Sequence, residues 1–395
     1  MRVGVIGGGI AGLAAAYELT SQGHFVEVFE QADFLGGQAS TFEVFGGRLE
    51  RGYHHLFTSD TDITDLIEEL NLEDRLAWLA SSVGFYLDRG DGGKIWDFAT
   101  PKDLLMFKPL SLLSRLKVGL WSLILKNSKN YRKFENITAK DWLLKRMGLS
   151  AYEVIWEPLL RGKFGEFYDR ISMTWIWGKM RLRVGSRKKS GTGELLGYPL
   201  GSFGEIIDRL ALKITQNGGV IHTSATVSQI VESRGSATSL DVTLHDSASE
   251  RRDYDAIVAT TPSYVFSRLA PPMPEIYQSK LDNIDYLSAV LMILVMDRPF
   301  TDKYWLNIAD RTMPFVALIE HTNLIPRKLY GGKHILYVSN YPSRSSELYM
   351  KSPEELIDLF VPHLKKINPG FDRSHIIEYH HHRVDGALPI VCLNY

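Results

Sequence analysis

Three glycines near the start of the chain have the spacing of a phosphate-binding turn. Gly7, Gly9 and Gly12 follow the apolar run 2–6 and precede an alanine-rich stretch, 11–21, with helical composition. In such a turn the first glycine permits the bend, the second lets the backbone approach a pyrophosphate, and the third lets helix and strand pack closely. The first amides of the helix would point at the phosphates, with the positive end of the helix dipole behind them.

A carboxylate after the next apolar run supports the same interpretation. The run 25–29 ends at Glu30, 18 residues after Gly12, close to the ~20 expected for an acid that binds ribose hydroxyls. Gln31 follows, where an arginine would accommodate a 2′-phosphate. A glycine turn without a ligand and a cleaved signal peptide both fit less well, because neither needs a strand that ends in an acid. The sequence therefore predicts a site for an adenine dinucleotide.

Two adjacent histidines, His54 and His55, are the candidate catalytic residues. They lie in the segment 51–57, directly after a predicted hairpin over 42–50. Neighbouring side chains on an extended segment point to opposite sides, so at most one of them can face a ligand. Histidine titrates near neutrality and could donate a hydrogen bond or carry a proton. The alternative is a pair of partly exposed loop histidines.

Other polar groups are weaker candidates. Five of them lie on predicted strands after residue 280: Glu320, His321, Tyr337, Asn340 and Tyr341. The run His380, His381 and His382 does not predict a metal site, because neighbours on a strand alternate faces and no carboxylate has a supporting spacing. We therefore expect no metal.

The length and composition of the chain limit what elements can position these residues. At 395 residues the chain is too long for one core, which predicts two domains. Hydrophobic residues make up 45% and charged residues 23%, as in ordinary globular proteins. The single cysteine, Cys392, excludes an internal disulfide and fits a cytoplasmic location. No run of about 20 apolar residues exists, so no membrane span is expected. We expect a small-molecule substrate and no nucleic-acid partner.

Charge is unevenly distributed along the chain. Residues 102–213 carry 22 Lys or Arg against 10 Asp or Glu, a net charge of +12 in a chain of net charge −1. The stretch 102–146 is predicted to be mostly helical, with a broad apolar face and 11 basic against three acidic residues. Such helices can lie in a membrane interface beside anionic lipids. The commoner alternative is a core-packing helix with a solvated basic face, and a third is a cleft for an anionic substrate.

The same insertion is rich in tryptophan. Trp142, Trp156, Trp175 and Trp177 could cover a substrate pocket or form an ordinary core. The basic run 187–189 that follows is typical of a solvated loop.

The dinucleotide fold is predicted to resume after this insertion. Segment 198–204 leads into an amphipathic helix that ends at Gly218 and Gly219, and 220–223 follows as a strand. Segment 254–262 is typical of a further strand that ends in a proline turn. Four predicted strands between residues 287 and 341 would then form a second sheet, and 353–368 is predicted to be a helix.

The glycine turn, Glu30 and the pair Gly36–Gly37 together resemble the FAD-binding flavin amine oxidase superfamily. That superfamily includes protoporphyrinogen oxidases, phytoene-type desaturases and, more distantly, UDP-galactopyranose mutases. The segments 198–204 and 255–262 match it too. The resemblance implies FAD as the cofactor, with the backbone of Val227 next to the adenine. The predicted cofactor-binding residues are Gly7, Gly9, Ala11, Gly12, Glu30, Gln31, Gly36, Gly37, Gln38 and Val227.

The resemblance also implies a fold and a function. The fold would be α/β, a Rossmann-like FAD-binding domain of the GR2 type interleaved with an α+β substrate domain. We expect residues 1–65 and 196–280, with the C-terminal end, in the FAD-binding domain. We expect 66–195 to be helical and basic, and 281–385 to form an antiparallel substrate sheet. The implied function is an FAD-dependent oxidoreductase that removes hydride from a C–N or C–C bond of an apolar or anionic substrate. A nucleotide-sugar mutase and a non-catalytic flavin-fold protein are the alternatives.

Two departures from the family pattern affect cofactor binding. Gln38 stands where the family usually has an arginine, so a charge-assisted phosphate contact is missing. Family members continue with a segment containing glycine and aspartate and a helix that closes over the flavin, whereas this chain stops at residue 395. We expect weak or no FAD binding on this account.

Overall fold

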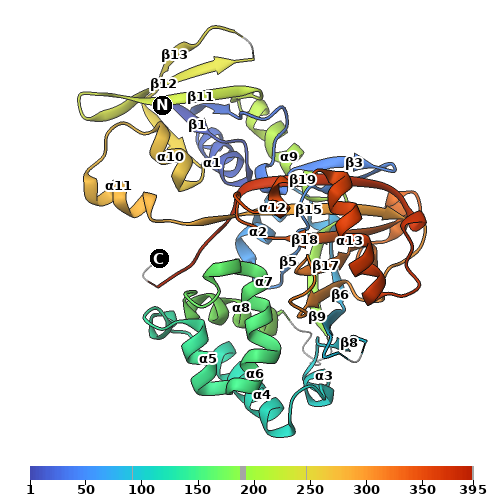
Figure 1. Ribbon diagram of the computed structural model, residues 1–395. Coiled ribbons are helices and arrows are strands. Elements are labelled where there is room, and N and C mark those ends of the chain that lie inside the picture. Colours follow the sequence, from blue (N-terminus) through green and yellow to red (C-terminus); the bar gives the residue numbers. More distant parts are fainter. Residues whose placement is uncertain (91, 187–192, 246, 394–395) are drawn as a thin grey trace.

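The first layer of the molecule is a four-stranded parallel sheet. The computed structural model in Figure 1 describes residues 1–90, 92–186, 193–245 and 247–393. The strand order is β10-β2-β1-β14. These strands are β1 (Arg2–Ile6), β2 (Phe25–Phe29), β10 (Val220–His222) and β14 (Ala256–Ala259). Because β10 and β14 come about 190 and 230 residues after β2, this sheet is completed only once the intervening chain has left it and returned.

Both faces of the parallel sheet are covered. Helices α1 (Ile10–Ser21) and α9 (Phe203–Gln216) pack together, and their apolar sides share a core with Val3 and Val5 of β1. Ile6 on the opposite face packs against a three-stranded antiparallel sheet. The strands of that sheet are β11 (Ala225–Ser233), β12 (Ser236–Leu244) and β13 (Glu250–Asp253). Burial on both faces explains the continuous apolar character of β1 and β2. The predicted α/β fold class is confirmed.

A seven-stranded sheet forms the second layer, with the order β19-β15-β18-β17-β16-β7-β8. Its strands are β7 (Val83–Leu87), β8 (Lys94–Asp97), β15 (Tyr286–Met296), β16 (Trp305–Ile308), β17 (Ala317–Glu320), β18 (His334–Asn340) and β19 (Ile376–Pro389). Alternate residues of β15 face opposite ways: Met292 packs toward α13 (Pro353–Ile367), and Ile293 joins the core below the parallel sheet. Helix α12 (Glu347–Met350) precedes α13.

The structure differs from the prediction in the segment 66–195, which is not uniformly helical. Strands β7 and β8 belong to the large sheet, and β6 (Leu76–Ser81) pairs with β9 (Glu194–Pro199), which also pairs with β5 (Leu56–Phe57). The large sheet is not wholly antiparallel, because β7 runs parallel to β16. Strand β7 forms a local hairpin with β8, but its pairing with β16 joins residues more than 200 positions apart, and no local pattern predicts that pairing. The sheet also extends beyond residue 385, to the end of β19.

The helical segment lies at the end of the molecule opposite β11–β13 (Figure 1). Its helices are α3 (Pro101–Met106), α4 (Leu112–Asn127), α5 (Ala139–Met147), α6 (Leu149–Ala151), α7 (Glu157–Phe164) and α8 (Met173–Gly185). Trp142 and Trp156 are buried in its core, as the core interpretation of the tryptophans predicted. Within the described ranges no helix is long and apolar enough to cross a membrane.

Short elements connect these layers. The hairpin β3 (Thr41–Val44) and β4 (Gly47–Glu50) leads through the segment 51–55 to α2 (Thr61–Glu69). Helices α10 (Ser263–Leu269) and α11 (Glu275–Asp282) connect the parallel sheet to β15.

Candidate functional site

The glycine turn joins β1 to α1 with backbone contacts that exclude larger side chains. Gly7 has a φ of +106°, which glycine adopts without strain. A Cβ on Gly12 would lie 1.9 Å from the carbonyl oxygen of Gly7, so only glycine permits this approach of helix to strand. Gly9 precedes the helix, and no side chain caps the first turn. The amides of that turn are therefore available to an anion.

The Glu30 carboxylate is fixed at the end of β2. Its two oxygens accept hydrogen bonds from the backbone amides of Gly8, at 2.7 Å, and Ala32, at 2.9 Å. These contacts tie the acid to the glycine turn. Each carboxylate oxygen retains acceptor capacity for a further donor, such as a ribose hydroxyl.

A second glycine pair approaches the first. Gly36 donates its amide to Gly8 O at 2.8 Å, and a Cβ on Gly37 would lie 3.2 Å from the Cα of Gly9. Both glycines of the pair have positive φ, 106° and 56°. Around this contact four of the predicted residues are exposed, namely Ala11, Gln31, Gly37 and Gln38. The turn thus presents backbone and small side chains to solvent while its glycines are packed from behind.

The start of β11 lies next to Glu30. The amide of Ala225 donates to Glu30 O at 2.8 Å, and Val227, two residues further along β11, packs against the end of β2. The ten predicted cofactor-binding residues therefore lie together around the carboxyl ends of β1 and β2. Ligands bind at such ends in open α/β sheets.

Glu50 is a buried carboxyl that the sequence did not single out. It is fully buried at the end of β4 and accepts hydrogen bonds from the Tyr198 hydroxyl, at 2.8 and 3.0 Å, and from the Phe203 amide, at 2.8 Å. Tyr337 donates to its backbone carbonyl at 2.7 Å. Burial raises its carboxyl pKa to about 7.

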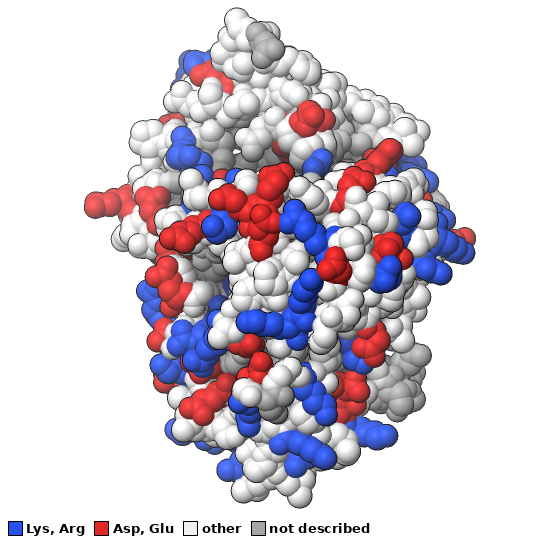
Figure 2. All heavy atoms as spheres, turned by 45° about the vertical axis from the view of Figure 1, so that its right-hand side comes forward, with Lys and Arg blue, Asp and Glu red and all other residues white. Residues whose placement is uncertain are grey.

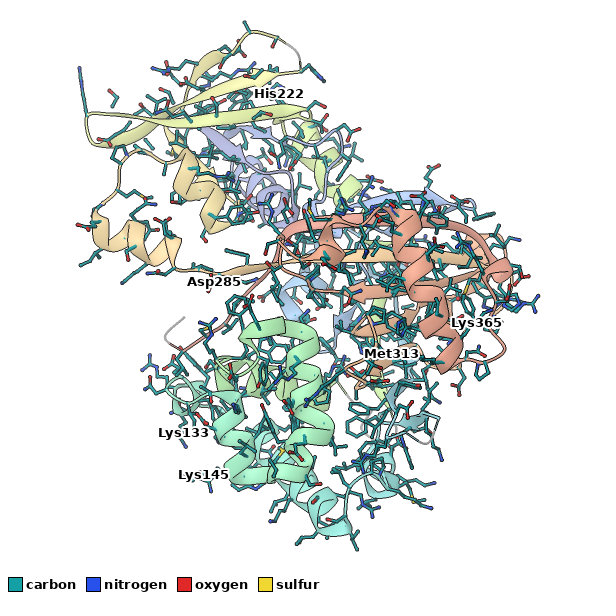
Figure 3. All side chains as sticks on the ribbon, in the orientation of Figure 1. Lys133, Lys145, His222, Asp285, Met313 and Lys365 are labelled. Carbon is teal, nitrogen blue, oxygen red and sulfur yellow. The ribbon has the colours of Figure 1, made fainter. Side chains whose placement is uncertain are left out.

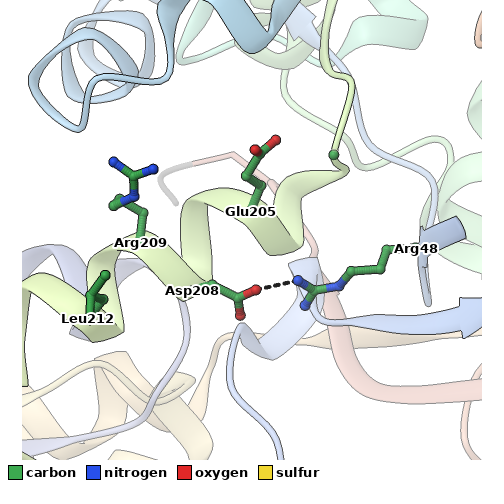
Figure 4. A pocket seen from close by; sticks show the side chains of 6 residues that line it. Arg48, Glu205, Asp208, Arg209 and Leu212 are labelled. Carbon is green, nitrogen blue, oxygen red and sulfur yellow. Dashed lines mark hydrogen bonds and ion pairs between the residues drawn. The ribbon is translucent and has the colours of Figure 1, made fainter.

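A neighbouring ion pair, Arg48 with Asp208, lines a separate surface pocket on α9 of about 330 Å³ (Figure 4).

The two histidines after Glu50 point to different partners, as the alternation rule predicts. His54 Nδ1 lies 2.6 Å from Gly52 O, which places the proton on Nδ1 because a carbonyl can only accept. His55 Nδ1 lies 3.1 Å from the Tyr304 hydroxyl. Burial lowers the pKa of both imidazoles, that of His55 to about 3. Burial therefore favours the neutral imidazole at both positions.

Beside the histidines, two tyrosines and a lysine from three distant segments meet. The hydroxyls of Tyr53 and Tyr341 are 2.6 Å apart, and Lys163 Nζ lies 3.6 Å from the centre of the Tyr341 ring. Lys163 projects from α7 and Tyr341 follows β18. Burial lowers the Lys163 pKa, while the nearby Tyr53 hydroxyl opposes that shift.

Two further cations from α8 continue this arrangement. The Arg183 guanidinium carbon lies 5.3 Å from the Trp305 ring centre, and Trp305 packs edge-on against Tyr53 at 5.1 Å. Lys179 is exposed, yet burial and the charges of Lys163 and Arg183 lower its pKa. The basic run 187–189 lies outside the described residues.

The polar candidates on the large sheet have different hydrogen-bond partners. Glu320 accepts from the amides of Phe300 and Thr301, at 2.9 and 2.8 Å, so it fixes a loop. His321 is buried with Nε2 2.8 Å from the Tyr330 hydroxyl, and burial lowers its pKa to about 3. Tyr337 and Tyr341 are the candidates that the structure places beside the segment 51–55, since the Tyr337 ring packs edge-on against Tyr53 at 5.9 Å and the Tyr341 hydroxyl bonds to Tyr53.

The three consecutive histidines of β19 alternate faces. The rings of His380 and His382 lie 4.7 and 5.0 Å from Phe42, while His381 is on the other face of the strand. In the part of the chain that the structure describes, no three His, Cys, Asp or Glu residues are grouped as metal ligands would be.

Comparison with known proteins gives a family match along nearly the whole chain. The family model of the flavin containing amine oxidoreductases matches residues 10–387. The mitochondrial protoporphyrinogen oxidase of Nicotiana tabacum is 30% identical over 173 residues, which are 44% of this chain and 34% of that protein. Coproporphyrinogen III oxidase of Staphylococcus aureus is 24% identical over 297 residues, 67% of this chain and 61% of that protein. The chain thus matches about a third of the length of the first relative and under two thirds of the second.

Solved structures show the same fold. An oxidoreductase from Methanosarcina mazei superimposes with a TM-score of 0.74 at 19% identity, over 99% of this chain and 89% of that one. A reduced UDP-galactopyranose mutase gives 0.74 at 17% identity, over 99% and 84%. At these identities the similarity concerns the architecture, which is shared by proteins of different activity.

Proposed function

The chain belongs to the flavin containing amine oxidoreductase family, and from that premise we propose that it is an FAD-dependent oxidoreductase acting on a small molecule. The proposed reaction is removal of hydride from a C–N or C–C bond. The observation that carries the cofactor proposal is the joint geometry of the glycine turn and Glu30, whose carboxylate is held by the amides of Gly8 and Ala32.

The residues around this turn fit an adenine dinucleotide. The uncapped first turn of α1, from Gly9 through Ala11 to Gly12, would receive the pyrophosphate. Glu30 would accept the ribose hydroxyls, with Gln31 beside it and the backbone of Val227 at the adenine. Gly36, Gly37 and Gln38 would close the other side, where a Cβ on Gly37 would lie 3.2 Å from the Cα of Gly9, a tighter contact than most side chains make.

The segment 51–55 would face the reacting end of the cofactor. FAD, when bound, accepts the hydride, so the protein needs no nucleophile and has only to orient the substrate. His54 is neutral, with its proton on Nδ1, and its Nε2 can accept a hydrogen bond. The hydrogen bond to Tyr304 orients His55. These two residues remain the proposed candidates for contact with the substrate.

Binding of FAD is tested directly with Glu30→Ala. The change removes both the ribose acceptor and the two anchors of the turn, and charge-assisted hydrogen bonds contribute about 1.5–3 kcal/mol each. We expect the dissociation constant for FAD, measured by flavin fluorescence titration, to rise at least about tenfold. Glu43→Ala, an exposed acid on β3, is the matched control. Equal FAD affinity in Glu30→Ala and the control would overturn the proposed cofactor site.

The reaction class is tested on the flavin-loaded protein without oxygen. Bleaching of the flavin absorbance by a candidate amine or porphyrinogen supports an oxidoreductase. Turnover of a nucleotide sugar only after dithionite reduction would instead support the mutase activity that a protein of the same fold has. A loaded protein that does neither would be a non-catalytic member of the family.

We also propose that the protein binds an anionic membrane surface peripherally, through α4, and works in a reducing compartment such as the cytoplasm. Six large apolar side chains of α4 are 43–65% exposed, namely Leu112, Leu113, Leu116, Leu120, Leu123 and Ile124. Only Val118 and Leu125 of that helix are buried. The core-packing prediction is therefore wrong for most of its apolar residues. Figure 2 shows a mostly uncharged lower end of the molecule, above which Lys and Arg side chains lie among some Asp and Glu. Such a surface suits lipid with acidic headgroups.

A further inference from the structure

We propose that Lys163, Lys179 and Arg183, here called the basic cluster, bind an anionic group of the substrate, a carboxylate or a phosphate. The inference rests on the proposed function only in taking the bound molecule to be the substrate. It assigns a role to side chains of α7 and α8 that the family match and the cofactor site leave without one.

The basic cluster brings three positive charges together, and the buried acid Glu194 acts on the same Tyr304 hydroxyl as Arg183 does. Within the described ranges, none of the three side chains forms an ion pair with an acid within 4.0 Å. The lowered pKa values of Lys163 and Lys179 have burial as their largest cause, and for Lys179 the charges of Lys163 and Arg183 add to it. Asp60 is the acid that opposes this shift at Lys179. Lys163 and Arg183 are partly buried and Lys179 is exposed. Placing like charges close together costs free energy, and an anion bound among them would recover it.

Aromatic rings connect the cations and define a shape for the ligand. Lys163 lies over Tyr341, Tyr341 bonds to Tyr53, Tyr53 packs on Trp305, and Arg183 lies near the Trp305 ring. A ligand along this line would contact ring surfaces with its apolar body and the cations with its acidic end. Arginine suits that role because its guanidinium can bind a carboxylate or phosphate through two parallel hydrogen bonds.

The basic cluster lies beside the histidines proposed to contact the substrate. The rings of His55 and Trp305 are 6.1 Å apart, and the charges of Arg183 and Lys179 contribute to the lowered His55 pKa. An acidic group held by the cluster would therefore anchor the substrate close to the segment 51–55. This anchoring is what positions one bond of a larger molecule for reaction.

Ser186 fixes α8 relative to that segment. Its hydroxyl donates to Leu195 O at 2.6 Å and accepts from the Thr58 amide at 3.0 Å, and the side chain is fully buried. The end of the helix that carries Lys179 and Arg183 is thus tied to the chain just beyond His55. A site needs such support to keep its groups in place.

The test measures anion binding without turnover, by calorimetry and tryptophan fluorescence at low salt. The probes are glutarate, inorganic phosphate and, as a dication of similar length, 1,4-diaminobutane. We expect an anion to bind and the diamine not to bind, with the stronger of the two anions showing which acidic group the site prefers. Arg183→Met and Lys163→Met should each weaken anion binding at least about tenfold, the equivalent of one lost charge-assisted contact.

Lys145→Met on α5 is the matched control, because this exposed lysine lies on the outside of the helical segment (Figure 3). Lys179→Met is a further variant, chosen because its exposed side chain can be replaced without opening a core. It should also weaken anion binding. Anions should raise the melting temperature of the parent protein but not of this variant. Unchanged anion affinity in the folded variants, including binding confined to the glycine turn, would overturn the inference. The parent protein tested with and without FAD separates this outcome from a failure of the proposed function, since anion binding here needs no flavin.

Discussion

At the scale of single residues, the buried carboxyl of Glu50 has the clearest energetic consequence. It lies where β4 meets the proposed substrate segment. It accepts hydrogen bonds from Tyr198 and Phe203, and within the described ranges no cation forms an ion pair with it. Burial raises its pKa from 4.5 to about 7. The folded protein therefore holds a proton that the unfolded chain releases.

The sign of this effect predicts a loss of stability as the pH rises. The contribution of Glu50 is fully present below about pH 4.5 and is lost as the pH rises through 7. Over that interval the loss amounts to about 3 kcal/mol of unfolding free energy. Glu50→Gln keeps an acceptor for the Phe203 amide and cannot ionise. Urea unfolding from pH 5 to 8 should show that the variant gains stability relative to the parent at the higher pH.

Other buried groups make the comparison with the variant necessary. Glu320 has a pKa raised to about 8 and acts in the same direction. His55 and His321 have pKa values lowered to about 3, so their contributions are present above about pH 6.5 and are lost as the pH falls. The difference between Glu50→Gln and the parent isolates one group. Glu43→Gln on the same hairpin should show no such difference, and a pH-independent effect of Glu50→Gln would contradict the assigned pKa.

At the scale of elements, α4 presents its apolar side chains outward. Leu112, Leu116 and Leu120 are spaced by four residues, so they lie along one face. Val118 and Leu125 attach the opposite side to the helical core. A helix of this kind is stable on the protein and can still insert its outer face into a lipid surface.

The vesicle experiment follows from this geometry. In the triple variant Leu116→Gln, Leu120→Gln, Leu123→Gln we expect co-sedimentation with phosphatidylglycerol vesicles at low salt to fall at least about tenfold, because burying each leucine in lipid contributes about 1.5–3 kcal/mol. The fold should persist, since these side chains are exposed. The double variant Leu212→Gln, Ile276→Gln removes exposed apolar residues elsewhere and should bind as the parent does. If the parent protein does not co-sediment with anionic vesicles at any salt concentration, the lipid proposal is wrong.

At the scale of the whole molecule, the two sheets share one core. Val5 and Val28 of the parallel sheet belong to the same buried cluster as Ile293 and Tyr337 of the large sheet. The helical core also extends into the large sheet, through Leu287 of β15. The parts named as separate domains from the sequence are therefore joined through the large sheet, which contributes residues to both cores.

Because both cores include residues of the large sheet, we expect the protein to unfold in one cooperative transition. Ile293→Ala opens a cavity in the shared core and should cost about 2–5 kcal/mol. Far-UV circular dichroism and tryptophan fluorescence should give the same midpoint in urea, and the variant should lower both equally. Leu160→Ala in the helical core is the comparison, and it should shift the same single transition. Two separate midpoints would show that the parts unfold independently.

The features that could be predicted from the sequence are local ones. The β1–glycine–α1 unit, the acid at position 30 and the second sheet after residue 280 each follow from a pattern within a short stretch, and the structure has them with small shifts of their ends. Hydrophobic periodicity and glycine spacing predict such features, because both reflect constraints on residues that are close in the sequence.

Which distant side chains meet depends on the packing of the folded chain. Lys163, Arg183, Tyr53 and Trp305 come from four elements and have no common spacing, and the burial that shifts the Glu50 and His55 pKa values arises from packing across the whole chain. Likewise β7 became a strand of the large sheet because it pairs with β16, and α4 turned its apolar face outward because other helices had filled the core. These outcomes depend on contacts between residues far apart in the sequence, which local sequence patterns do not predict.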